Sequence, residues 1–67
     1  MDTITAAFFA KENGTLEAFL SEHEDEREVI QSALDRGTLI GAQQDTKGFA
    51  YFDENKVLLA DTRPLYN

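Results

Sequence analysis

The sequence contains no cysteine and no tryptophan, and it has only one histidine and one proline. Without cysteine there is no disulfide, and a structural zinc site is not expected because His23 is the one soft ligand in the chain. No apolar run approaches the ~20 residues that span a bilayer, and no basic region precedes an apolar stretch as it does in a secretory signal. We therefore expect a soluble cytoplasmic protein with no membrane partner, in keeping with a reducing compartment.

The 67 residues are enough for one domain with a small core, so we expect a single domain over residues 1–67. At this size one core supplies about 3–5 kcal/mol, and small natural domains often add disulfides, a metal ion or oligomerisation. Disulfides are excluded and a zinc site is not expected, so homodimerisation is the remaining way in which this chain could gain stability.

The charge of the chain is concentrated in one segment. Residues 12–28 carry seven acidic residues against Arg27 alone, which gives −6 of the formal net charge of −7. A field of this sign repels nucleic acid and anionic membranes and attracts basic surfaces. We expect a basic protein partner and no direct contact with nucleic acid.

Residues 16–36 have the apolar spacing of an amphipathic helix. A single helix beginning after Thr15 and ending at Gly37 is the preferred prediction. Ser21 and Glu24 also match a capping box, so two helices with a corner near Ser21 stay open as the alternative. The predicted stripe comprises Leu16, Leu20, His23, Arg27, Ile30 and Leu34, with Phe19 beside it.

The remainder of the chain predicts a β-meander. Strands are expected at residues 38–44, 49–52 and 57–61, joined by turns at 45–48 and 53–56. Residues 3–10 fit a strand or a short helix equally well, and residues 62–67 are expected to form a C-terminal tail because Pro64 cannot continue a central strand. The predicted fold is therefore α+β, with one dominant acidic helix packed on a three- or four-stranded antiparallel sheet.

The strongest candidate site is the acidic part of the predicted helix. On one continuous helix these acids would be spaced about 3 Å apart, roughly half the charge density of duplex DNA. The functional interpretation is an anionic surface that docks on a basic partner, and the alternative is a solvated helix face. The candidate partner-binding residues are Glu17, Glu22, Glu24, Asp25, Glu26 and Glu28.

Nothing in the sequence indicates an enzyme. Nucleophilic catalysis needs an activated nucleophile beside a base, and the single His23 has no organised set of partners around it. There is no glycine-rich phosphate loop either. We predict no catalytic residues, no metal site and no cofactor.

Residues 29–40, followed by Phe49 to Asp53, resemble the last helix and the wing strands of a winged-helix domain. The resemblance implies a DNA-binding regulator whose last helix enters the major groove with basic and polar residues. In this sequence the leading turns of that helix are acidic and the hairpin tip offers only Lys47. The preferred function is therefore a small acidic protein-binding module, such as an inhibitor or nucleic-acid mimic of phage or mobile-element type. A winged-helix-like regulator and a self-associating structural subunit are the alternatives.

Overall fold

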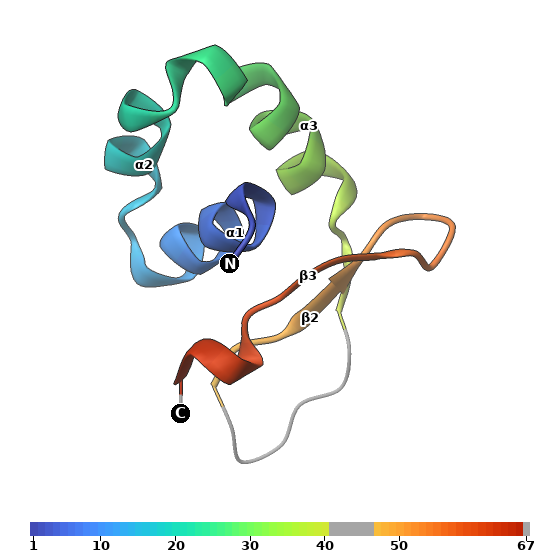
Figure 1. Ribbon diagram of the computed structural model, residues 1–67. Coiled ribbons are helices and arrows are strands. Elements are labelled where there is room, and N and C mark those ends of the chain that lie inside the picture. Colours follow the sequence, from blue (N-terminus) through green and yellow to red (C-terminus); the bar gives the residue numbers. More distant parts are fainter. Residues whose placement is uncertain (41–46, 67) are drawn as a thin grey trace.

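The computed structural model describes residues 1–40 and 47–66 (Figure 1). Helices come first in the chain and strands follow, and both pack around the first helix, so the predicted α+β class is confirmed. The predicted strand over 38–44 and the turn over 45–48 lie largely outside the described residues. The elements are α1 (Thr3–Asn13), α2 (Leu16–Glu22), η1 (Glu24–Glu26), α3 (Arg27–Arg36), β1 (Leu39–Ile40), β2 (Ala50–Phe52), β3 (Leu58–Asp61) and η2 (Arg63–Tyr66).

The ambiguous N-terminal segment is the helix α1, so it adds no strand to the sheet. The side chain of Asp2 caps it by accepting a hydrogen bond of 2.7 Å from the backbone N–H of Thr5. Gly14 ends it in the left-handed region, with φ of 76°. Ala7, Phe8 and Ala10 are buried along this helix, which lies between α2, α3 and the strands in Figure 1.

The prediction of one continuous helix over residues 16–36 is wrong. The chain forms α2, a turn of 3-10 helix and α3, with the break at His23 rather than at Ser21, which lies inside α2. Ser21 therefore caps nothing, and the Thr15 side chain makes no cap hydrogen bond. The alternative of two helices was closer to the structure, but it placed the corner near Ser21, two residues before the break at His23.

Packing explains why the helix breaks. A straight helix over residues 16–36 would be about 31 Å long, whereas α2 and α3 both pack against the shorter α1. The bend allows Leu20 of α2 and Ile30 of α3 to be buried in one core, at 1% and 0% exposure. Burying both side chains releases more free energy than the few backbone hydrogen bonds lost at the corner.

The strands form one antiparallel sheet in the order β1–β2–β3. Leu39 pairs with Phe52, and Tyr51 pairs with Ala60, with an irregularity in register after Tyr51. The predicted turn at 53–56 is confirmed: the carboxylate of Asp53 accepts hydrogen bonds from the backbone N–H groups of Asn55 and Val57, at 2.8 and 2.9 Å. This turn joins β2 to β3 at the sheet end farther from α2 (Figure 1).

The core centres on Phe8, whose ring stacks on that of Tyr51 with centroids 4.3 Å apart. The predicted apolar stripe is confirmed, since Leu20, Ile30 and Leu34 are buried and Leu16 packs against them partly exposed. Gly37 lies under the same ring, so that a Cβ there would sit 2.5 Å from Cζ of Phe8. This close approach, and not a left-handed backbone, accounts for glycine at the end of α3, because φ of Gly37 is −77°.

Residues 62–66, expected as part of a tail, pack closely against the rest of the protein. Thr62 is fully buried, and residues 63–66 form the helix η2. The ring of Tyr66 meets that of Phe9 edge-on, with centroids 5.2 Å apart. Gly48, at φ of 82°, supports this arrangement, because a Cβ there would meet Tyr66 and Thr62 within 3 Å.

Candidate functional site

Five of the six acidic residues predicted to bind a partner lie around the corner between α2 and α3, and Glu17 lies at the other end of α2. Glu17 and Glu22 lie on α2, Glu24, Asp25 and Glu26 form η1, and Glu28 begins α3. We call these six residues the acidic corner. All six are exposed, so the structure places every predicted site residue on the surface.

The bend changes how these charges are arranged. Glu17 and Glu28 belong to different helices, so the acids do not form the straight row that was predicted, and the comparison with the charge spacing of DNA no longer holds. In η1 three consecutive acids point in different directions, because a 3-10 helix turns once every three residues. The acidic corner is therefore a clustered, convex surface.

His23 lies at the corner itself and contacts the end of α2. Its Nδ1 lies 2.8 Å from the carbonyl oxygen of Phe19, which can only accept, so Nδ1 carries the proton. Its ring stacks on that of Phe19 with centroids 4.1 Å apart. The Glu24 carboxylate accepts a long hydrogen bond of 3.4 Å from Arg27. These local contacts fix the end of α2 and the start of α3 on either side of the corner, and the other acids of the corner are exposed.

A second constellation was not predicted from the sequence. The carboxylate of Glu12, near the end of α1, accepts hydrogen bonds from three hydroxyl groups: Tyr51 at 2.5 Å, Tyr66 at 2.8 Å and Thr62 at 2.9 and 3.0 Å to its two oxygens. The Thr62 hydroxyl in turn accepts from the backbone N–H of Phe49 at 3.0 Å. We call Glu12, Tyr51, Thr62 and Tyr66 the carboxylate cluster.

The carboxylate cluster changes the acidity of both tyrosines. Burial, followed by the hydrogen bond to Glu12, raises the pKa of Tyr51 well above its usual range. The hydrogen bond to Glu12 is the main cause of the raised pKa of Tyr66. Neither hydroxyl is therefore prepared to act as a base, and the cluster reads as a structural tie between α1, the sheet and η2.

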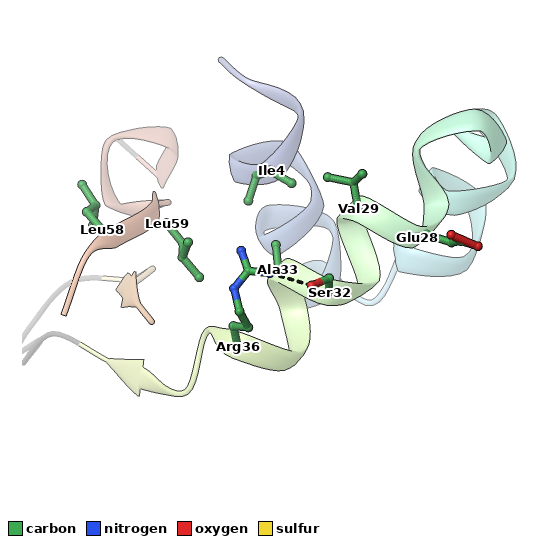
Figure 2. Close-up of a pocket in the computed structure, with 8 residues that line it drawn as sticks. All are labelled: Ile4, Glu28, Val29, Ser32, Ala33, Arg36, Leu58 and Leu59. Carbon is green, nitrogen blue, oxygen red and sulfur yellow. Dashed lines mark hydrogen bonds between the residues drawn. The ribbon is translucent and has the colours of Figure 1, made fainter. Parts of the chain in front are cut away.

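Two surface depressions lie elsewhere on the protein, although Glu28 of the acidic corner borders one of them. One, of about 520 Å³, is bordered by Glu12 and Tyr66 of the cluster together with Asn13, Lys47, Gly48 and Phe49. The other is a groove of about 490 Å³ between α1, α3 and β3. Figure 2 shows its wall residues Ile4, Ala33 and Leu59, with Arg36 and Glu28 toward the two ends of α3. We call this second depression the α3 groove.

Over residues 1–40 and 47–66, no three acidic or histidine side chains are grouped closely enough to hold a metal ion. No described helix is long and apolar enough to cross a bilayer. Comparison with known proteins found no matching family model, curated protein or solved structure.

Proposed function

We propose that this chain is a non-enzymatic protein-binding module that docks on a basic partner through the acidic corner. The observation that carries the proposal is that six exposed carboxylates lie on α2, η1 and the start of α3, five of them around one corner, while the contacts described use only Glu24, in its pairing with Arg27. Like charges held together cost stability unless something offsets them. A basic partner surface would offset that cost on binding.

Electrostatics also determines what kind of binding is proposed. Exposed charges steer a partner during approach, so they affect the association rate and its dependence on salt more than the final affinity. An inhibitor that occupies the nucleic-acid site of a basic protein, acting in the cytoplasm, is the particular form of this function that fits the net charge of −7.

The test compares two double variants that change the net charge equally. Asp25→Asn with Glu26→Gln neutralises two acids of the corner, whereas Asp35→Asn with Glu54→Gln neutralises two exposed acids elsewhere. Association with a panel of basic domains and lysine-rich peptides is measured at several salt concentrations. We expect the corner variant to associate several-fold more slowly at low salt, and the control to behave nearly as the wild type.

Both variants should unfold within about 0.5 kcal/mol of the wild type, because the altered side chains are on the surface. A slower association would then reflect the surface and not the fold. Equal loss of association rate in the two variants would reject the acidic corner as a site, since overall charge would explain the result.

The second candidate is a winged-helix-type DNA-binding regulator. It is favoured by the order of elements, in which α3 leads directly into the antiparallel pair β1 and β2. The acids at the start of α3 oppose it, because binding to DNA depends on cations that neutralise phosphates. Titration with duplex DNA separates the two candidates: sub-micromolar binding at physiological salt would favour the regulator over the protein-binding module.

A further inference from the structure

The α3 groove exposes apolar side chains that the fold of one chain does not cover. Val29 on α3 and Leu58 on β3 line it with 65% and 53% of their surfaces exposed. Ile4 of α1 and Leu59 of β3 are partly buried beside them. A contiguous apolar surface on a small domain indicates a contact with another molecule.

The charges along the groove have a particular order. Glu28, Ser32 and Arg36 follow one another at intervals of four residues, so they share one face of α3. The guanidinium of Arg36 donates a hydrogen bond of 2.5 Å to the hydroxyl of Ser32 (Figure 2). Along the axis of α3, the acidic Glu28 and the basic Arg36 therefore lie about 6 Å from the small residue Ser32, one on each side.

This order is self-complementary. If two copies of α3 lie antiparallel about a two-fold axis at Ser32, each Glu28 faces the partner's Arg36. A symmetric dimer needs a surface of this kind, because every contact occurs twice with the roles exchanged. The parallel arrangement would instead place like charges opposite each other.

We propose that the α3 groove is the interface of a homodimer in which two α3 helices cross antiparallel at Ser32. When Arg36 turns from Ser32 to the partner's Glu28, the small side chain of Ser32 lets the helix axes approach to about 8–10 Å. Val29 and Leu58 of each chain then pack on the other chain, and the two Glu28–Arg36 pairs set the direction of the helices. Glu28 belongs to both surfaces, whereas the other five residues of the acidic corner do not line the groove. The dimer proposal rests on the groove residues and does not depend on the docking function.

The first experiment measures molar mass against protein concentration by sedimentation equilibrium. The wild type should form dimers, and Leu58→Asn should weaken them by about tenfold or more in dissociation constant. Val57→Asn is the matched control, because Val57 is the neighbouring residue, is 57% exposed and does not line the groove. A wild type that stays monomeric up to about 1 mM would overturn the proposal, as would equal weakening by the two variants.

The second experiment tests the antiparallel direction. Glu28→Arg and Arg36→Glu should each weaken the dimer by bringing like charges together, and the two changes combined should restore it. The chain has no cysteine, so Ser32→Cys offers a single thiol that should cross-link to its symmetry mate under mild oxidation. Ser21→Cys, exposed on α2, should not cross-link. Failure of the charge swap to restore association, or equal cross-linking of the two cysteine variants, would rule out this geometry.

Discussion

The carboxylate of Glu12 and the hydroxyl of Thr62 lie 2.9 Å apart although 50 residues separate them in the chain. Thr62 is fully buried, and the described residues contain no buried side-chain nitrogen or oxygen without a hydrogen-bond partner. The Glu12 carboxylate accepts a hydrogen bond from the buried Thr62 hydroxyl, and it also accepts those of the Tyr51 and Tyr66 hydroxyls. The pair therefore connects the end of α1 to the last turn of the chain.

Replacement of Glu12 by Gln should destabilise the protein substantially. The amide loses the charge that strengthens three hydrogen bonds, and its NH₂ group faces hydroxyls that need an acceptor. We expect a loss of about 1–3 kcal/mol in the free energy of unfolding, measured by urea denaturation. Glu17→Gln is the control, since Glu17 is exposed, and should change stability by no more than about 0.5 kcal/mol.

Stability should fall at alkaline pH, and the carboxylate cluster should be the reason. Folding raises the pKa of Tyr51 and Tyr66 above their unfolded value, so the folded state favours the protonated phenols. This contribution is complete below the unfolded pKa of about 10 and is lost as pH rises through the higher folded values. Thermal unfolding from pH 8 to pH 11 should show the decline in the wild type.

The same pH series gives a control for the tyrosines. A variant with Tyr51→Phe and Tyr66→Phe should be less stable at pH 8 and lose less stability than the wild type on going to higher pH. If both proteins declined in parallel, the alkaline sensitivity would belong to other groups, and the tie between Glu12 and the tyrosines would not explain it.

Neighbouring positions on α3 should respond very differently to truncation. Ile30 is fully buried in the core and Val29 is 65% exposed. Ile30→Ala should cost about 2–5 kcal/mol, because it removes buried methylene groups and leaves a cavity. In chemical denaturation of the monomer, Val29→Ala should change the midpoint little. Equal shifts of the two midpoints would mean that α3 is rotated from the orientation described.

Alanine should be tolerated at Gly14 far better than at Gly48. Both residues have positive φ, 76° and 82°, so each substitution costs about 1 kcal/mol of backbone strain. A Cβ at Gly14 would meet open space, whereas at Gly48 it would lie 2.8 Å from the ring of Tyr66 and 3.0 Å from Cα of Arg63. Gly48→Ala should therefore cost about 1–3 kcal/mol more than Gly14→Ala, as measured by thermal unfolding.

The sequence predicted the parts of this fold that depend on local patterns. The spacing of Leu20, Ile30 and Leu34 correctly identified a buried helical stripe, and Asp53 correctly marked a turn. The capping-box pattern at Ser21 and Glu24 left a break open but could not place it at His23, because local propensity allows the helix to continue and the bend arises from packing around α1. Residues 3–10 were undecided for a related reason: so short a run has no clear period until its neighbours are known.

The candidate sites likewise divide into one formed by residues close in sequence, which was predicted, and two formed by residues far apart in sequence, which were not. The acidic corner was predicted because its residues are close in sequence and charged residues are normally exposed. Glu12 was not singled out, because its partners come from positions 51, 62 and 66 and no sequence motif joins them. The α3 groove was also missed, since its walls come from three elements and only the assembled fold shows that Glu28 and Arg36 flank it.

The tie between Glu12 and the C-terminal turn has a consequence for biosynthesis. The N-terminal helices can begin to pack as soon as they leave the ribosome, but the hydroxyls that satisfy the Glu12 carboxylate are translated 39 to 54 residues after it. A nascent chain that stops short of Tyr66 therefore carries an incompletely paired acid, because one of the three hydroxyls that donate to Glu12 is missing. The protein should reach its protease-resistant state only when Tyr66 is present, so that chains truncated before η2 remain open to digestion and chains that include η2 do not.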